Sequence, residues 1–347
     1  MPTPTIPDGE LFMNATLWTG TGSTRSVANG NPGQSFQPDL VWLKIRSSAD
    51  SNGLFDSVRG AGKRLQSNDT SAEATTTAVQ SAFTSDGFTV GTDPQSNGNG
   101  STYVGWQWKA GGAAVTNTAG SISAQVSANT TSGFSIVTYT GNATSGATVG
   151  HGLGVAPSFI IAKSRTQAAT DWPTYHISTG NNGGCTLNET AAKVTTAIWW
   201  NNTTPSSTVV TLGNGAQTNG NTQSMVAYCW APIAGYSAFG SYTGNGSTDG
   251  PFVYTGFRPR FVIIKSSTFA GADWVMYDSA RNTYNALTSE LSPNSSAAEN
   301  NYGGAARMDF VSNGIKMRTA GAGLNNSGST YIYMVFAENP FKYANAR

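Results

Sequence analysis

The segment Pro259-Arg-Phe-Val-Ile-Ile-Lys265 decides the fold, because the chain contains this pattern three times. The other two copies are Pro38-Asp-Leu-Val-Trp-Leu-Lys44 and Pro157-Ser-Phe-Ile-Ile-Ala-Lys163. Each copy begins at a proline, runs through four apolar residues and ends on a lysine. The copies follow one another at about 100 to 120 residues, which is the size of a small domain and too long for a solenoid turn or a propeller blade. The sequence therefore predicts a triplicated chain with three tandem domains.

Further landmarks recur in step with this pattern. An aromatic residue followed by Thr-Gly precedes each copy, at Trp18, Tyr139 and Tyr242, and an aromatic-rich run closes each unit. The first and third units also share Asp56-Ser-Val-Arg59 and Asp278-Ser-Ala-Arg281, which have no counterpart in the middle unit. We therefore divide the chain into an N-terminal arm, a first repeat, a linker, a second repeat and a third repeat, at residues 1–13, 14–110, 111–132, 133–232 and 233–347. The linker could be flexible, although Ile122, Gln125 and Val126 could add a strand.

Composition indicates an all-β protein. The 41 glycines and 14 prolines, together with abundant Ser, Thr and Asn, interrupt the sequence every several residues. No segment of helical length has apolar residues at i, i+3 and i+4, whereas short runs rich in Val, Ile, Phe, Tyr and Trp stand between turn residues. Units of about 100 residues with this pattern are typical of β-sandwiches. We expect three tandem β-sandwich repeat domains of a jelly-roll-like kind.

Two apolar runs indicate how the domains pack. A strand with one face in water alternates apolar and polar residues, but residues 261–264 and 331–336 have no charged or small polar residue at any position. Such strands are covered on both faces, and a lone sandwich covers only one face of each sheet. We therefore expect extensive packing between domains or between subunits.

Charge excludes several classes of partner. Charged residues make up 11% of the chain, well below the roughly 25% of an ordinary globular domain. The formal net charge of +1 provides no electrostatic footprint for nucleic acid or anionic lipid. The N-terminus lacks the basic and apolar regions of a signal peptide, and no apolar run is long enough to cross a bilayer. We expect a soluble protein with no nucleic-acid partner, no membrane insertion and no ordinary secretion signal.

The sequence predicts no metal site and no cofactor. Neither His151 nor His176 has a second histidine or a cysteine at a ligand-like spacing. Cys185 and Cys229 both fall in the middle unit without a CxxC pattern, and we interpret them as small buried hydrophobes. Spacing alone leaves a disulfide between these two cysteines open.

The sequence also predicts no catalytic residues, so we expect that the protein is not an enzyme. There is no G-x-S-x-G nucleophile elbow. Paired carboxylates could serve glycoside hydrolysis, and the candidates are Asp56, Asp86, Asp273, Asp278 and Asp309. Sparse charge argues against a dense acidic cleft. Asp56 with Arg59, like Asp278 with Arg281, is expected to form a local pair.

Two short segments are candidates for binding. Trp199-Trp200 precedes Asn201-Asn202, and adjacent side chains on a strand point to opposite faces. One tryptophan could then point outward, where it could stack on a sugar ring or seal a subunit contact, although core or interface packing is the commoner role for each. The arm is punctuated by prolines and could anchor the protein to a neighbour, although a frayed terminus is the commoner outcome; its candidate anchoring residues are Pro2, Pro4, Ile6 and Pro7.

Seven short motifs resemble those of a known family. They are Ile6-Pro-Asp-Gly9, Phe36-Gln-Pro-Asp-Leu-Val-Trp42, Phe55-Asp-Ser-Val-Arg-Gly60, Tyr242-Thr-Gly-Asn-Gly246, Gly256-Phe-Arg-Pro259, Tyr277-Asp-Ser-Ala-Arg-Asn282 and Phe336-Ala-Glu-Asn-Pro-Phe-Lys-Tyr343. On these motifs nearly the whole chain resembles repeat-containing virion structural proteins of tailed bacteriophages, of the marine and cyanobacterial type. The family has no catalytic motif to compare.

The resemblance implies a structural protein on the exterior of a virion, assembled in the host cytoplasm without a signal peptide. Our first hypothesis is a tail fibre or tail-associated adhesin, trimeric as such fibres usually are, which contacts host surface polysaccharide and other virion proteins. The second hypothesis is a capsid decoration or head-fibre protein that is anchored by the arm. The third is a tailspike that degrades glycans.

Overall fold

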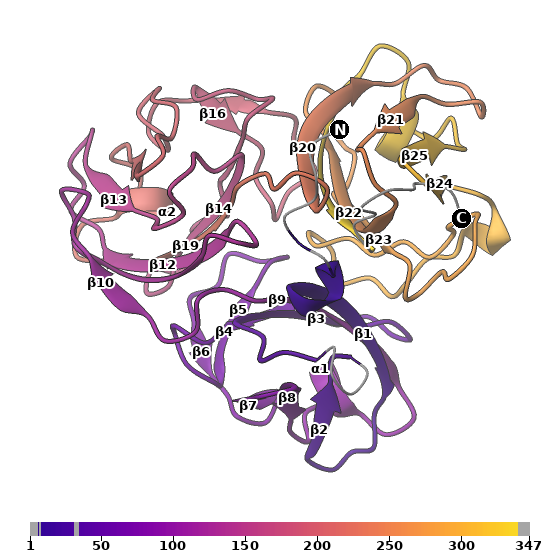
Figure 1. Cartoon of the computed structure of the whole chain (residues 1–347), viewed down its shortest axis with the longest axis horizontal. Coiled ribbons are helices and arrows are strands. Elements are labelled where there is room, and N and C mark those ends of the chain that lie inside the picture. The colour runs from indigo at the N-terminus through magenta and orange to yellow at the C-terminus, as the bar shows by residue number, and fades with distance from the viewer. Residues whose placement is uncertain (1–5, 7, 31–34, 339–347) are drawn as a thin grey trace.

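The computed structural model describes residues 6, 8–30 and 35–338 of the chain. Within these residues the chain is all-β, as the sequence predicts, with 26 strands and no α-helix longer than four residues. All strand pairs within the sheets are antiparallel. Figure 1 shows the strands gathered in three units around a common centre.

The first unit is built on one large and one small sheet. Its elements are η1 (Gly9–Leu11), β1 (Met13–Thr19), β2 (Arg25–Ala28), β3 (Leu40–Ile45), β4 (Gly53–Asp56), β5 (Lys63–Gln66), β6 (Ala74–Thr75), β7 (Gln80–Thr84), β8 (Gly87–Val90), α1 (Pro94–Asn97) and β9 (Thr102–Trp108). The large sheet has the order β1-β9-β3-β4-β5-β6, and the small sheet has the order β2-β8-β7.

The second unit combines a large sheet with two small ones. Its elements are β10 (Val115–Asn117), β11 (Ala124–Asn129), β12 (Phe134–Thr140), β13 (Thr148–Gly150), β14 (Phe159–Ser164), β15 (Thr174–His176), β16 (Gly183–Gly184), β17 (Val194–Thr195), β18 (Val209–Thr211), α2 (Ala216–Asn219) and β19 (Ser224–Trp230). The large sheet has the order β10-β11-β12-β19-β14-β15, and β13-β18 and β16-β17 form two small sheets.

Residues 111–132, for which we predict a linker, contribute β10 and β11 to this large sheet. β11 pairs with β12 from Ala124 opposite Tyr139 to Asn129 opposite Phe134. Ala124 and Val126 are buried in the core of the second unit, whereas Gln125 between them is exposed. This alternation is what a strand with one covered face requires, so the segment is an integral part of the second unit.

The third unit again combines a large sheet with a small one. Its elements are β20 (Ser237–Thr243), β21 (Phe252–Tyr254), β22 (Pro259–Ser266), β23 (Val275–Asp278), η2 (Tyr302–Gly304), β24 (Met308–Val311), β25 (Gly314–Met317), α3 (Ala322–Asn325) and β26 (Thr330–Ala337). The large sheet has the order β20-β26-β22-β23, and the small sheet has the order β21-β25-β24.

The same strand arrangement recurs at the centre of the three large sheets. The closing strand of each unit, which is β9, β19 or β26, lies between the strand with the aromatic-Thr-Gly motif, which is β1, β12 or β20, and the strand with the proline-to-lysine pattern. The repeat in the sequence thus corresponds to a repeat in strand order. The finer description of each unit as a jelly-roll sandwich stays a prediction.

Side chains of the patterned strands alternate between two cores. In β22, Val262 and Ile264 belong to a cluster within the third unit, whereas Phe261 and Ile263 belong to a cluster that all three units share. β3 and β14 alternate in the same way. These strands are therefore covered on both faces, which confirms the expectation from their apolar runs. The cover comes from other units of the same chain, so this packing does not require a second subunit.

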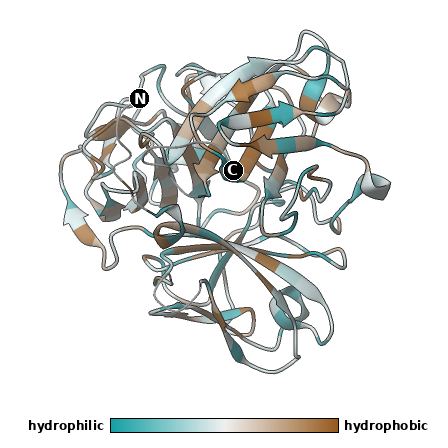
Figure 2. Cartoon of the chain, turned by 45° about the vertical axis from the view of Figure 1, so that its right-hand side comes forward, coloured by the Kyte–Doolittle hydropathy of each residue, from teal (hydrophilic) through white to brown (hydrophobic). Residues whose placement is uncertain are grey.

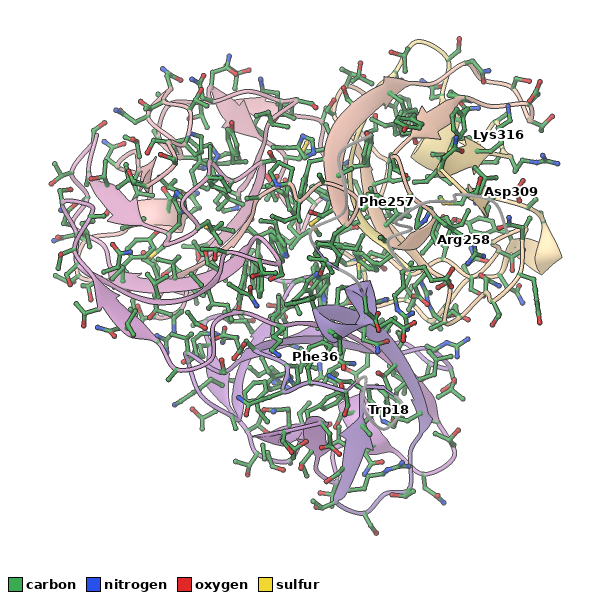
Figure 3. The ribbon with its side chains drawn as sticks, in the orientation of Figure 1. Trp18, Phe36, Phe257, Arg258, Asp309 and Lys316 are labelled. Carbon is green, nitrogen blue, oxygen red and sulfur yellow. The ribbon has the colours of Figure 1, made fainter. Side chains whose placement is uncertain are left out.

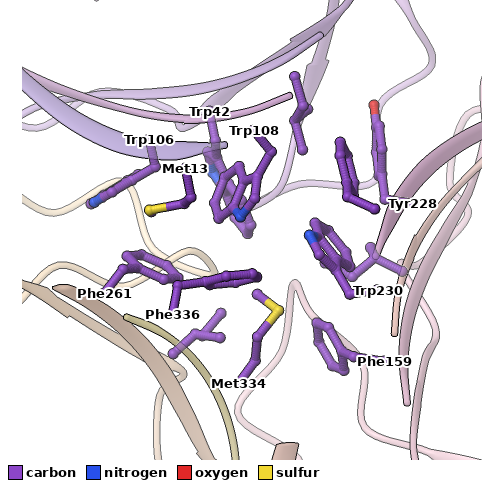
Figure 4. Close-up of a cluster of buried hydrophobic side chains, with 14 of the residues drawn as sticks. Met13, Trp42, Trp106, Trp108, Phe159, Tyr228, Trp230, Phe261, Met334 and Phe336 are labelled. Carbon is purple, nitrogen blue, oxygen red and sulfur yellow. The ribbon is translucent and has the colours of Figure 1, made fainter. Parts of the chain in front are cut away.

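The shared core is aromatic and lies where the three units meet (Figure 4). Trp108 at the end of β9 is at its centre, with ring centroids 5.9 Å from those of both Trp230 and Phe336 and 5.5 Å from that of Phe261. All four side chains are buried. Colouring by hydropathy shows that the most hydrophobic segments lie on the strands (Figure 2). Burial of such large side chains by three units at once is the main hydrophobic force that joins them.

The lysine that ends each proline-to-lysine pattern joins its unit to another one. Lys163 of the second unit donates from Nζ to the Thr70 carbonyl of the first unit at 3.1 Å. Lys44 of the first unit donates to the carbonyl of Ser296 in the third unit at 3.2 Å, and Lys265 of the third unit donates to that of Thr190 in the second at 3.0 Å. The three contacts therefore close a ring: second to first, first to third, and third to second.

A buried asparagine at the end of each short helix holds the preceding Thr-Gly turn. The Oδ1 atom of each asparagine accepts a hydrogen bond from a backbone N–H of that turn, and its Nδ2 donates to loop carbonyls. The three residues are Asn97, Asn219 and Asn325. A side-chain amide can satisfy several backbone groups that have no strand partner. This explains why helices of a single turn persist at the same place in all three units.

Candidate functional site

The structure does not support an outward tryptophan at Trp199-Trp200. Trp199 is 5% exposed and Trp200 is 1% exposed, and both belong to the core of the second unit. The prediction assumed a strand, but residues 198–202 form a turn in which Asn201 and Asn202 have φ of 50°. In a turn, adjacent side chains need not point to opposite faces, so both rings reach the core. This pair is not a surface for sugar binding.

The described part of the arm packs against its own chain. Ile6 is fully buried in the shared core, so it is not part of a free anchor. At Gly9, an added Cβ would lie only 3.0 Å from the carbonyl oxygen of Ala337, which places η1 directly against the end of β26. Glu10 forms an ion pair with Arg260 of the third unit. The remaining candidate anchoring residues, Pro2, Pro4 and Pro7, lie outside the described residues.

Both histidines are buried and have structural partners. The Nδ1 atom of His176 accepts the N–H of Ser178 at 3.0 Å, and its Nε2 lies 3.0 Å from the carbonyl of Tyr333 in the third unit. These partners require a neutral ring that donates from Nε2. Burial lowers the pKa of His176 to about 4, and burial also lowers the pKa of His151. No group of His, Cys, Asp or Glu in the described residues is arranged to hold a metal ion.

The two cysteines are free thiols and belong to different cores. Cys185 lies in the shared core and Cys229 in the core of the second unit. Burial raises the pKa of Cys185 to about 11 and that of Cys229 to about 12. Both therefore have the character of small buried hydrophobes rather than of reactive thiols.

In the described residues, no helix is long and apolar enough to span a membrane.

Asp56 belongs to a buried charge cluster between the first two units. Arg59 forms an ion pair with Asp56 and, at 3.0 Å, with Glu73, which also pairs with Arg165 of the second unit at 2.8 Å. The hydroxyl of Tyr228, in the second unit, donates to Asp56 at 2.7 Å. Burial alone would raise the pKa of Glu73, but hydrogen bonds from Arg165 and the charge of Arg59 lower it. The expected local pair therefore exists, and it also joins two units.

Asp278 occupies the same place between the third and first units. Arg281 pairs with Asp278 at 2.6 Å and with Glu299 at 3.1 Å. Arg46 of the first unit pairs with Glu299 at 2.8 Å, and the indole N–H of Trp106 donates to Asp278 at 2.9 Å. Both aspartates are thus saturated with structural partners, in two different interfaces.

The other acidic candidates lie apart and also have local partners. Asp86 accepts from the Thr84 hydroxyl at 3.0 Å, and Asp273 accepts from the Asn294 amide at 2.6 Å. Asp309 pairs with Arg318 at 3.4 Å. The described residues therefore show no pair of these carboxylates that faces a common cleft.

Exposed aromatic side chains occur on the small sheet of the third unit. On β21, Val253 points into the core, whereas Phe252 is 49% and Tyr254 is 56% exposed. Lys316 is opposite Phe252 on β25, and Asp309 is opposite Lys316 on β24. Gly314 and Val311 continue the row from Tyr254. We call this surface the outer face of the third unit, and it consists of Phe252, Tyr254, Asp309, Val311, Gly314 and Lys316. Figure 3 shows Asp309 and Lys316 at the periphery of the third unit.

A pocket adjoins the outer face where that face ends at Val311. It lies between the loop after β23, the β24–β25 turn and the ion pair of Arg258 with Glu338. The Asn285 side chain pairs with the backbone of Phe310 through two hydrogen bonds of 2.9 Å, which covers the free edge of β24. Tyr284, 84% exposed, stands at the rim. The pocket and the outer face together form the strongest candidate for a binding surface.

Comparison with known proteins identifies the family. The profile of a family described as a domain of unknown function (DUF7483) matches residues 8–340. The chain belongs to this family. One match covers the strands of all three units, as expected for units that share a core. No curated protein matches the chain.

Sequence reasoning missed Phe252 and Tyr254, although the triplication contains a signal for them. In each unit, one strand of a small sheet pairs with the strand that leads to the short helix, and it has a valine at its centre. The three segments are Ser26-Val-Ala28, Thr148-Val-Gly150 and Phe252-Val-Tyr254. Only the third copy of this DUF7483 chain flanks the valine with aromatic residues. Aligning the copies around the valine would have identified the pair.

Proposed function

We propose that the protein is a structural component of the exterior of a tailed-bacteriophage virion, assembled in the host cytoplasm. Within that class we favour a tail fibre or tail-associated adhesin that contacts host surface polysaccharide. The observation on which this rests is the outer face of the third unit, where two aromatic side chains are exposed. The other two units have small residues at the matching positions. The resemblance of the sequence motifs to virion structural proteins supplies the setting.

The packing of the three units supports a structural role. Contacts from buried lysines, a shared aromatic core and two buried charge clusters join every unit to both others. Such a body has few ways to flex, which suits a part that must hold its shape outside a cell. The acidic residues that could have served a glycan-degrading tailspike are used in structural pairs, so the tailspike is the least favoured of the three hypotheses.

The capsid decoration or head-fibre protein is our second candidate. The burial of Ile6 limits any anchoring part of the arm to the residues before it. Deletion of residues 1–13 would also remove Met13 from the shared core, so the fair test is deletion of residues 1–5. If the arm attaches the protein to a capsid, that truncation abolishes attachment while the melting temperature stays within a few degrees.

Labelled virions distinguish these candidates. Gold-conjugated antibody against the protein, imaged on intact phage particles, is expected to mark the tail, whereas label on the head would favour decoration. Particles without label, from a lysate in which the protein is detected, would contradict the proposal. A homotrimer remains part of the adhesin hypothesis, and light scattering of the purified chain tests it.

A further inference from the structure

We infer that the outer face of the third unit binds a linear neutral oligosaccharide through stacking on Phe252 and Tyr254. The inference rests on the proposed function, because it names the ligand class of the same surface. The first step in the argument is that the fold does not need these rings. β2, β13 and β21 take equivalent places, and each buries one valine. The other two strands flank it with Ser26 and Ala28 or with Thr148 and Gly150.

The second step concerns the arrangement of the rings. Side chains two residues apart on a strand lie on the same face at a separation of about 7 Å. The Phe252 ring leans across β25 onto Gly314, where an added Cβ would lie 2.9 Å from one ring carbon and 3.0 Å from another. This contact holds one side of the ring and leaves it 49% exposed. Two adjacent aromatic rings at this spacing can contact neighbouring units of a sugar chain.

The third step concerns charge, which selects the kind of ligand. Lys316 donates to the Gly250 carbonyl at 2.6 Å and pairs with Asp249, and Asp309 pairs with Arg318. The two cations and two anions cancel, so the surface has hydrogen-bonding groups without a net charge. Single-stranded nucleic acid would also stack on aromatic rings, but it requires a basic groove along its backbone. Aromatic rings beside balanced polar groups suit the apolar faces and hydroxyls of a neutral sugar.

The surface is long enough for an extended ligand. Val311, opposite Gly314, belongs to the outer face and also lines the adjoining pocket. From there the lining continues to Asn285 and to Tyr284, whose ring is 84% exposed. The rows of paired residues run from β21 across β25 to β24, and the pocket lies beside the end of the row at Val311. A chain of several sugars that stacks on β21 and follows this row would reach the pocket.

The test uses the full chain and an array of neutral linear oligosaccharides built from glucose, galactose, mannose, rhamnose and N-acetylhexosamines. The array also carries a sulfated oligosaccharide, an oligothymidylate and extended peptides. We expect binding to at least one neutral glycan, with a loss of tenfold or more in F252A/Y254A. The matched control, V115A/I198A, truncates two exposed apolar side chains of the second unit and is expected to bind as the unchanged protein does.

Two further variants separate stacking from general hydrophobic contact. F252W/Y254W is expected to retain binding within about threefold, whereas F252L/Y254L is expected to lose it as F252A/Y254A does, since Leu has no aromatic face. Thermal melting of every variant checks that the sheet is folded. Retained binding by F252L/Y254L, preference for the peptide or charged probes, or no binding to any neutral glycan would overturn the inference.

The outcome is separable from that of the proposed function. Label on the tail with no glycan binding would leave the virion role standing and remove the oligosaccharide. Glycan binding without label on any particle would leave the oligosaccharide inference standing and contradict the virion role.

Discussion

Two interfaces in this molecule have the same geometry and different chemistry. Where the second unit meets the first, a backbone N–H of Glu73 donates to the Arg165 carbonyl at 2.7 Å, and the side chains of both residues enter a buried charge cluster. Where the third unit meets the second, Lys193 donates to the Ser267 carbonyl at 2.9 Å in the same way. There the charge cluster is absent, because His176 and Thr179 replace Asp56 and Arg59.

In the interface of the third unit with the second, three of the four charged residues of the cluster have neutral counterparts, and we call this the neutral interface. Lys193 takes the place of Glu73 there. Removal of one partner leaves another charge buried and unpaired, at a cost of about 3–5 kcal/mol, whereas replacing all partners can be neutral. The strand residue that faces the cluster changes with it. Tyr228 donates to Asp56, but Met334, at the matching place in β26, has no polar hydrogen. His176 instead uses the backbone carbonyl of Tyr333.

The largest effect is expected from R59M. This substitution leaves Asp56 buried without its cation, whereas Glu73 keeps its pair with Arg165. We therefore expect a loss of about 3–5 kcal/mol in the free energy of unfolding. Thr179 is the matching residue of the neutral interface, and T179V removes only one hydroxyl hydrogen bond, at about 1 kcal/mol. Urea unfolding of both variants measures the contrast. Equal losses would show that the charges do not distinguish the two interfaces.

The neutral interface should instead be sensitive to pH through His176. Its pKa in the folded state is about 4, below the ordinary value of about 6.5. The unfolded chain therefore takes up a proton first as the pH falls, and stability decreases between about pH 6.5 and 4, by about 1.4 kcal/mol per pH unit for each proton. Unfolding at pH 7.5, 6 and 5 is expected to show this slope.

H176Q is the control for that slope, because glutamine does not titrate. H176Q should remove part of the decrease in stability between pH 6.5 and 4. The part that remains is due to His151, because burial also lowers the pKa of His151. The lowered pKa values of Glu73 and Glu299 affect stability only as the pH falls below about 4.5, outside most of this window. An unchanged slope in H176Q would contradict the assignment.

A smaller effect sharpens the idea that the charges act as a set. The triple variant D56N/R59M/E73Q removes the carboxylates together with their cation. We expect it to recover about 1–3 kcal/mol relative to R59M alone, because no carboxylate is then left buried without its cation. Arg165 loses its partner Glu73 but is partly exposed to water. Chemical denaturation of the two proteins side by side gives the difference, and a triple variant less stable than R59M would refute the coupling.

The smallest effect is expected at the rim of the charged interface. Arg165 is partly exposed in its pair with Glu73, and exposed or partly exposed pairs contribute about 0.2–1 kcal/mol. R165Q should therefore cost less than 1 kcal/mol, and its effect should shrink further in high salt. Thermal melting at two salt concentrations measures it. A loss comparable with that of R59M would mean that the rim pair matters as much as the buried one.

The double burial of the patterned strands could be predicted from sequence because it affects every residue of a run. Phe261 and Ile263 must face one core if Val262 and Ile264 face another. The partners Glu73 and Glu299 could not be found in this way. They lie in irregular loops, where only the folded backbone brings them to Arg165 and Arg46.

At Trp199-Trp200 and at residues 111–132 the sequence leaves two alternatives open, and in both the structure takes the second one. Asn201-Asn202 favours a turn over a strand, so both tryptophans pack in the core. In residues 111–132, the strand that Ile122, Gln125 and Val126 allow forms in place of a flexible linker. The outer face was missed for another reason. Exposed aromatic residues look like core residues in a sequence, and only comparison of the three copies around Val253 separates them.

The contact of Gly9 with Ala337 has a mechanical consequence. Gly9 and Ala337, close to the first and last residues that the structure describes, lie against each other at one place on the three-unit body. A load applied at Gly9 and a load applied at Ala337 therefore reach the three-unit body at the same place. A pull between the two ends acts first on Ile6 and the aromatic centre, and does not stretch the units apart one after another.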